Sequence, residues 1–265
     1  MAENSDFPRY DYPVLAWEYD QRQPAPFPGE LEWYAKYGAL SGGQILELAC
    51  GSGRLTIPLA DAGYHIDGVD RSETMLDRLR TKLKDCDAEV RQRVRLFCAD
   101  IKDFKSDLKY GTVFLAYNSL QYLEKKETIQ TFFSRMPRLL QKGGHFLFVV
   151  RRFSQSYFTD GKRVVYDNMK SPDVDREKGL SVGCRFTAYL DSSNSHVVNE
   201  ETYEIVHADG QRQLILQVSR SPVIDTAEYL TLLGNAGLAV QVYSGYDESP
   251  EDGRSRELCF ACRRD

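Results

Sequence analysis

Short apolar segments alternate with amphipathic ones through the first half of this 265-residue chain, and this alternation is its most constraining feature. Ser72 can cap a helix that follows it, and this helix carries Met75, Leu76, Leu79 and Leu83 on one face. A second helix is predicted over residues 125–140, ended by the glycine pair at 143–144. The short apolar segments are residues 44–49, 65–69, 94–98, 112–117 and 145–150. Such an alternation is typical of a doubly wound, mostly parallel α/β sheet.

The pattern changes after residue 151. Strand-like runs follow one another without helices, and Asp209-Gly210 is a hairpin turn signal. The runs cover residues 163–166, 180–190, 197–207 and 211–219. A helix at 226–236 and strands at 240–246 and 257–263 then complete a seven-stranded sheet. We therefore predict an N-terminal arm (1–30), a core (31–152 and 221–265) and an antiparallel β insertion (153–220) after the fifth strand, which roofs the site.

Composition and charge narrow the possible partners. The net charge of −5 argues against a nucleic-acid partner held mainly by phosphate contacts. No run approaches the roughly 18 apolar residues of a membrane span. The six cysteines are scattered, and Cys259 and Cys262 lie in a strand-like run with no second pair, so we interpret all six as reduced thiols that bind no metal. These features predict a cytoplasmic protein.

Four polar residues fall at the ends of predicted strands: Glu47, Asp70, Asp100 and Asn118. In doubly wound sheets, ligands bind beyond the carboxyl ends of the strands. Four polar side chains at equivalent places therefore predict a ligand site at that edge of the sheet.

A glycine turn, Cys50-Gly-Ser-Gly53, joins the first of these strands to a helix. Its glycines permit positive φ and a close approach of the backbone to a ligand. Asp70 at the end of the next strand can accept hydrogen bonds from ribose hydroxyls, which also fits a nicotinamide dehydrogenase. That family's fingerprint requires Gly or Ala where this chain has Thr56. A carboxylate at Glu47 would repel a pyrophosphate, but it suits a cationic ligand.

The order of these motifs resembles that of the Rossmann-like (class I) S-adenosylmethionine-dependent methyltransferases of the small-molecule type. The segment from Ile45 to Arg54 (ILELACGSGR) resembles their first motif, and Gly68-Val-Asp70 with Arg71-Ser72 the second. The third and fourth are matched by Cys98-Ala-Asp-Ile101 and by the segment 114–122, and residues 139–144 and 232–237 resemble two later signatures. Four motifs in order at the family's spacing are a specific signal.

The resemblance implies S-adenosyl-L-methionine as the cofactor and a role for each matched residue. Ala49 to Gly53 would lie under the methionine portion, with Gly51 in the turn. At the methionine end, the cofactor would meet Glu47, Arg54 and Asn118. The ribose and adenosine would contact Asp70 and Arg71. The adenine would contact Met75, Asp100 and Ile101. Each of five residues also has a structural alternative. Glu47 would support the turn, Asp70 would cap the helix that begins after Ser72, and Asp100 would be a loop carboxylate. Arg54 would be a solvated helix residue, and Met75 would belong to the core.

Methyl transfer from a sulfonium is an in-line displacement, so the enzyme must mainly align the acceptor and exclude water. A base is needed only if the acceptor must lose a proton. Tyr19 and Gln121 are the catalytic candidates. The substrate candidates are Tyr12, Trp17, Tyr122 and Arg152. The aromatic residues of the arm have the alternative role of anchoring it.

The leading hypothesis is methyl transfer to a nitrogen or oxygen of a small molecule, favoured by the aromatic arm and the insertion. An RNA or protein methyltransferase is the alternative, although the N-P-P-Y signature of many nucleic-acid methylators is replaced by Tyr117-Asn-Ser-Leu120. A non-catalytic cofactor-binding module and a nicotinamide oxidoreductase are further alternatives. The insertion is also a candidate surface for a homodimer.

Overall fold

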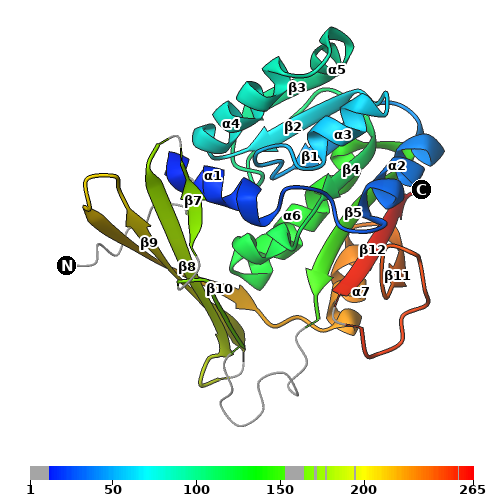
Figure 1. The fold of residues 1–265 in the computed structure, drawn as a ribbon. Coiled ribbons are helices and arrows are strands. Elements are labelled where there is room, and N and C mark those ends of the chain that lie inside the picture. The colour runs from blue at the N-terminus through cyan, green and yellow to red at the C-terminus, as the bar shows by residue number, and fades with distance from the viewer. Residues whose placement is uncertain (1–11, 153–163, 170–171, 177, 194, 256) are drawn as a thin grey trace.

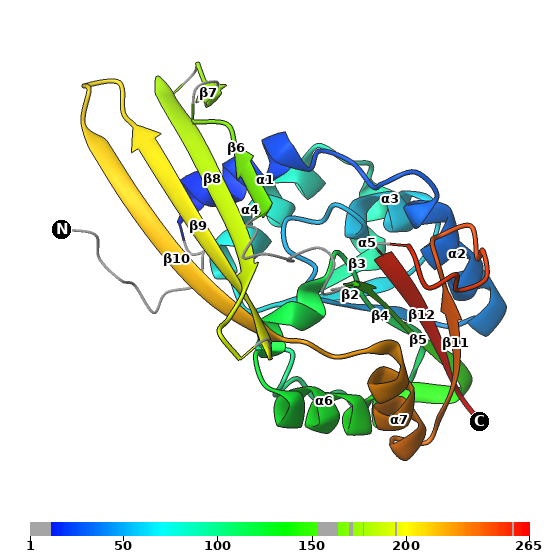
Figure 2. The same ribbon diagram turned by 90° about the horizontal axis from the view of Figure 1, so that it is seen from below.

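The computed structural model describes residues 12–152, 164–169, 172–176, 178–193, 195–255 and 257–265. These residues form two sheets with helices around the larger one, and helix α1 lies between the two sheets (Figures 1 and 2). The structure of the first part of the predicted arm and of residues 153–163 therefore lies outside the described residues.

The larger sheet has seven strands in the order β11-β12-β5-β4-β1-β2-β3. Strands β3, β2, β1, β4 and β5 are parallel, and β12 is antiparallel to both β5 and β11. The strands are β1 (Ile45–Leu48), β2 (Ile66–Asp70), β3 (Val94–Cys98), β4 (Tyr110–Leu115), β5 (Leu140–Arg151), β11 (Leu238–Tyr243) and β12 (Glu257–Arg264). The predicted seven-stranded, mostly parallel sheet is confirmed.

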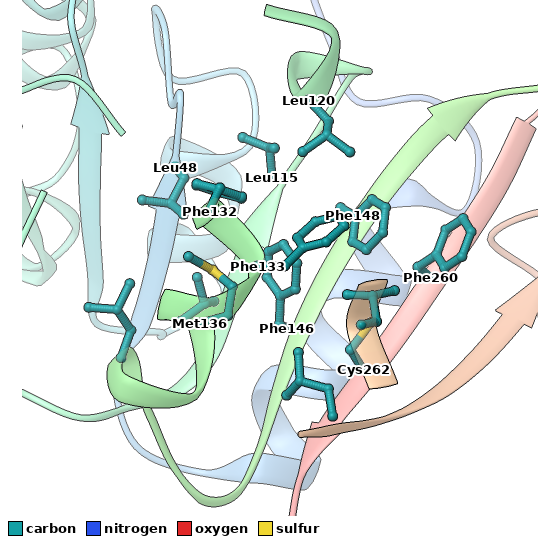
Figure 3. Packing of buried hydrophobic residues seen from close by; sticks show 14 of the residues in the cluster. Leu48, Leu115, Leu120, Phe132, Phe133, Met136, Phe146, Phe148, Phe260 and Cys262 are labelled. Atoms are coloured by element: carbon teal, nitrogen blue, oxygen red, sulfur yellow. The ribbon is translucent and has the colours of Figure 1, made fainter. Parts of the chain in front are cut away.

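Helices cover both faces of this sheet. On one face, Phe133 of α6 (Lys126–Leu139) packs against Phe146 and Phe148 of β5, together with α7 (Thr226–Asn235) (Figure 3). The alternate residues of β5, Leu147 and Val149, face the other layer. That layer contains α2 (Glu30–Ser41), α3 (Thr56–Asp61), α4 (Glu73–Lys84) and α5 (Ala88–Arg93). Both faces of β5 are therefore apolar, as is usual for a strand in a sheet that is covered by helices on both sides.

The same alternation explains the cysteine pair of β12. Cys262 lies in the cluster on the α6 face, whereas Cys259 lies in the cluster on the α2 face, and both are fully buried. Residues three apart on a strand point to opposite faces. These two thiols are therefore separate core residues, and all six cysteines are free.

The second sheet is the insertion, and it is antiparallel as predicted. Its strands are β6 (Val164–Asp167), β7 (Asp173–Asp175), β8 (Leu180–Leu190), β9 (His196–Val206) and β10 (Arg212–Pro222). The predicted turn Asp209-Gly210 joins β9 to β10, with Gly210 at φ 82°. Helix α1 (Pro13–Arg22) contributes Leu15 to an apolar cluster on this sheet, while Ala16 and Tyr19 pack against Met75 of α4. One short helix thus contacts both halves of the molecule.

Two differences from the sequence prediction near the site have a clear structural cause. The glycine pair Gly143-Gly144 does not end a helix, because α6 has already ended at Leu139 and the pair lies inside β5. A Cβ at Gly144 would meet the carbonyl oxygen of Gly111 at 2.8 Å, so this glycine allows the irregular register between β4 and β5. The helix expected directly after the glycine turn begins only at Thr56, because Arg54 and Leu55 still belong to the turn. The predicted cap of α4 is confirmed, since Ser72 Oγ accepts a hydrogen bond from the Met75 amide at 3.2 Å.

Candidate functional site

The glycine turn after β1 is tied to the end of β2. The Gly51 amide donates to Asp70 Oδ2 at 2.8 Å, and the Ser72 amide donates to Oδ1 at 2.9 Å. Ala49 and Gly51 have positive φ values of 57° and 55°, so the turn curls sharply at the carboxyl end of its strand. Burial raises the pKa of Asp70, and the two amides oppose that shift because they stabilise the charged form. Asp70 is thus held rigidly at the sheet edge.

Gly53, the second glycine of the turn, has a different role. Its φ is 85°, and an added Cβ would lie 2.2 Å from Leu79 Cδ1 of α4. The absence of a side chain at Gly53 therefore allows the turn to pack closely against α4.

Glu47 is a buried carboxyl group near the end of β1. It is 3% exposed, and the Thr56 hydroxyl donates to its Oε2 at 2.5 Å. Burial raises its pKa to about 8, with the Thr56 hydrogen bond opposing the shift. The residue that departs from the dehydrogenase fingerprint therefore holds this carboxyl group in position.

Arg54 is buried, contrary to the alternative of a solvated residue. Its guanidinium forms a two-point ion pair with Glu30 of α2, with Nη2 2.9 Å from Oε1. The guanidinium carbon lies 5.2 Å from the ring centroid of Phe27 and 5.3 Å from that of Tyr117. Two donors of the Arg54 guanidinium thus bind a protein carboxylate, and contacts with the two aromatic rings keep the guanidinium group in position.

The arm helix is fixed over the turn by Asp20. Its Oδ1 accepts from the Ser52 hydroxyl at 2.5 Å and from the Lys82 ammonium at 3.1 Å, and Arg78 also pairs with it. The neighbouring Tyr19 is buried, with its ring 6.2 Å from that of Tyr117. Burial raises the pKa of Tyr19 above its ordinary value, so this phenol stays protonated at neutral pH.

A cavity of about 450 Å³ lies where these elements meet. Asp100 stands on its wall, where its Oδ1 accepts from the Lys102 amide at 2.8 Å. The predicted site residues that line this cavity are Tyr19, Glu47, Ala49, Gly51, Arg54, Asp70, Arg71, Met75, Asp100, Ile101 and Tyr122. Most of the set predicted from the sequence is therefore brought together in one place.

A second cavity, of about 870 Å³, adjoins the first and is lined by Asn118, Gln121 and Arg152. Asn118 Oδ1 is buried and has no hydrogen-bond partner among the described residues. Tyr117 and Asn118 follow β4 with consecutive positive φ values of 52° and 57°. Left-handed backbone costs a non-glycine residue about 1–2 kcal/mol, and such strain is concentrated at functional sites.

Four residues line both cavities and mark where they join: Tyr117, Tyr122, Glu201 and Ser219. Glu201 and Ser219 come from β9 and β10, so strands of the insertion line both cavities. Glu201 is 9% exposed, and the Tyr203 hydroxyl donates to its Oε2 at 2.7 Å.

Sequence reasoning missed Glu201 and its neighbour Gln217, although a signal was present. Asn199, Glu201, Tyr203 and Ile205 alternate along β9 and are all buried. A carboxylate on the apolar face of a two-residue period is unusual, because buried charges need a partner or a ligand.

Two residues predicted at the substrate site lie elsewhere. Tyr12 and Trp17 pack against the apolar cluster between α1 and the insertion, and they line neither cavity. Their aromatic rings anchor the arm, which was the alternative interpretation. Within the described residues, no group of three or more His, Cys, Asp or Glu side chains is arranged to hold a metal ion, and no helix is long and apolar enough to cross a membrane.

Comparisons with known proteins agree with this geometry. Residues 45–144 match the family model described as a methyltransferase domain. A putative methyltransferase of a Geobacillus strain is 26% identical over 258 residues, which cover 94% of this chain and 98% of that protein. The sugar N-methyltransferase KedS8 of Streptoalloteichus superposes with a TM-score of 0.75 at 20% identity, covering 100% and 97% of the two chains. The CcbJ methyltransferase of Streptomyces caelestis superposes with a TM-score of 0.71 at 20% identity, covering 91% and 90%. At this level of identity, the structural likeness concerns the fold.

Proposed function

We propose that this chain, whose residues 45–144 match the model of a methyltransferase domain, transfers the methyl group of S-adenosylmethionine to a nitrogen or oxygen of a small molecule. The observation that carries the proposal is the second cavity, which adjoins the cavity at the glycine turn and shares four lining residues with it. Its volume of about 870 Å³ is within the range of about 300–1,000 Å³ that is usual for small-ligand pockets.

The chemistry of the first cavity fits the cofactor. The carboxylates of Asp70 and Asp100 are acceptors for ribose hydroxyls and for an adenine amino group, respectively. Ile101 and Met75 offer apolar surface for the adenine ring, and Arg71 flanks it. Ala49 and Gly51 present a wall without large side chains. Glu47 and Arg54 contribute polar groups near the turn, although each already holds a protein partner.

The bound cofactor supplies a methyl group activated on a sulfonium, and the chain's residues align the acceptor and exclude water. Tyr19 closes the cofactor side and remains a protonated phenol, so its role is positioning. Gln121, Tyr122 and the amide of Asn118 orient the acceptor from the core side of the second cavity. Arg152 stands farther along that cavity, where it already pairs with Glu251.

Glu201 is the group best situated to accept a proton from the acceptor. It is the carboxylate that lines both cavities, and it sits at their junction. An ammonium acceptor must lose a proton before its nitrogen can attack the methyl group. A carboxylate oxygen of Glu201 would take that proton and also favour a cationic acceptor over a neutral one.

Calorimetry with S-adenosylhomocysteine tests the cofactor half of the proposal. We expect binding by the unmodified protein, no binding of NAD, and loss of affinity in Asp70→Ala. The matched control is Asp61→Ala, because Asp61 is exposed and lines neither cavity. Absence of S-adenosylhomocysteine binding by the unmodified protein would refute the cofactor assignment.

The acceptor class is tested with methyl-labelled S-adenosylmethionine and a cell extract separated into protein, RNA and small-molecule fractions. We expect label in the small-molecule fraction. Label confined to protein or RNA would replace this acceptor class with the macromolecular alternative. Pairing of two copies through the insertion and a cytoplasmic location stay predictions; light scattering checks the former and cell fractionation the latter.

A further inference from the structure

Gln217 lies in the middle of β10, an edge strand of the insertion, and its side chain lines the cavity at the glycine turn. Its cross-strand partner on β9 is Glu201, and the next pair on the same face of the two strands is Ser219 and Asn199. Ile215, two residues earlier and therefore on the same face, is buried against α1. The packing of Ile215 thus fixes the direction in which Gln217 points.

The amide oxygen of Gln217, Oε1, is a buried acceptor without a hydrogen-bond donor among the described residues. Leaving a buried polar group unpaired costs about 1–3 kcal/mol, so native structures seldom keep one without a reason. The cavity that Gln217 lines is where a hydrogen-bond partner would arrive, since the same cavity is also lined by Asp70 and Asp100.

We propose that Gln217 accepts a hydrogen bond from the adenosyl cofactor, so that the insertion sheet, as well as the core, binds the cofactor. This inference rests on the proposed function, because it requires the cofactor to occupy this cavity. Besides the adenine amino group, which we assign to Asp100, such a ligand offers its α-ammonium group and its ribose hydroxyls as donors. The cofactor then bridges the two sheets, and its binding fastens β10 onto the core.

The consequence for the second cavity is direct. Glu201 and Ser219, which lie beside Gln217, form part of the junction between the cavities. Fastening β10 therefore also fixes the wall against which the acceptor binds. Cofactor binding would order the acceptor site before the acceptor arrives.

The test compares two substitutions on the same strand. Gln217→Leu removes the amide while keeping most of its volume, and Gln213→Leu is the matched control because Gln213 is exposed and lines neither cavity. Titration calorimetry with S-adenosylhomocysteine is expected to show a loss of about tenfold for Gln217→Leu, the factor that corresponds to one hydrogen bond of about 1.4 kcal/mol. Methylthioadenosine lacks the α-ammonium but keeps the adenosine portion, so it distinguishes the donors: an equal loss assigns a donor of the adenosine portion, and no loss assigns the ammonium.

Two further readouts separate this role from a structural one. The melting temperature of unliganded Gln217→Leu should be equal to or above that of the unmodified protein, because the unliganded protein leaves the amide oxygen unsatisfied. Hydrogen exchange over residues 196–222 should slow on S-adenosylhomocysteine binding in the unmodified protein and the control, but less in Gln217→Leu. An affinity of Gln217→Leu within twofold of the control would overturn the inference alone, whereas failure of the unmodified protein to bind would overturn the proposed function.

Discussion

Replacing Gly53 by alanine should destabilise the protein without weakening cofactor binding. The new Cβ would lie 2.2 Å from Leu79 Cδ1, which is fully buried and cannot move away freely. Overpacking of this kind costs about 1–3 kcal/mol. The residue also has φ 85°, and left-handed backbone costs alanine a further ~1–2 kcal/mol. The expected loss is therefore about 2–5 kcal/mol.

Gly63→Ala separates the two contributions. Gly63 has φ 99° and no neighbouring atom within 4 Å of an added Cβ, so it bears only the backbone cost of about 1–2 kcal/mol. Urea unfolding should show Gly53→Ala to be less stable than Gly63→Ala by about 1–3 kcal/mol. In the double variant Gly53→Ala/Leu79→Ala, the loss of unfolding free energy should be smaller than the sum of the losses in the two single variants. The reason is that Leu79→Ala removes the atom with which the new Cβ clashes.

Equal losses in Gly53→Ala and Gly63→Ala would refute the packing argument. Calorimetry with S-adenosylhomocysteine, well below the melting temperature, supplies the functional half of the test. Since Gly53 does not line either cavity, we expect unchanged affinity. A large loss of affinity in a folded variant would instead mean that this glycine approaches the cofactor.

Two further predictions concern carboxyl groups. Burial raises the pKa of Glu47 from its ordinary 4.5 to about 8, so the folded state binds the extra proton and the free energy of unfolding should fall as pH rises between these values. Glu47→Gln should lose that part of the slope in urea unfolding at pH 5, 6.5 and 8; an unchanged slope would contradict the shift. Glu201→Gln should lower methyl transfer to an amine at least tenfold, while S-adenosylhomocysteine affinity stays unchanged. Equal rates in the two forms would remove Glu201 from the proton transfer.

The order of elements along the chain made much of the site predictable. Asp70 and Asp100 each end a short apolar strand, and parallel strands bring their carboxyl ends to one edge, so their meeting follows from the sequence. Asn118 follows the same rule, yet the strained turn after β4 directs its side chain into the second cavity. The rule fixes the edge of the sheet but not the direction of a side chain in a turn.

Residues of the insertion were harder to assign, for a physical reason. Which face of β9 and β10 meets the core depends on how a separate sheet docks, and that docking involves residues distant in the sequence. Trp17 could not be assigned from the sequence for a similar reason. An aromatic residue in an arm has the same local sequence signal whether it lines a pocket or packs against a sheet, and Trp17 packs against the sheet. Only the three-dimensional arrangement of α1, the insertion and the core resolves these two ambiguities.

The position of helix α1 between the two sheets has a consequence for biosynthesis. Leu15 emerges from the ribosome early, but it packs against Ile215, about 200 residues later in the chain. At a synthesis rate of about 5–20 residues per second, the apolar face of this helix waits roughly 10–40 s for its partner strand. During that interval the apolar face of α1 has no sheet to cover it, so this face is exposed to chaperones while the rest of the chain is made.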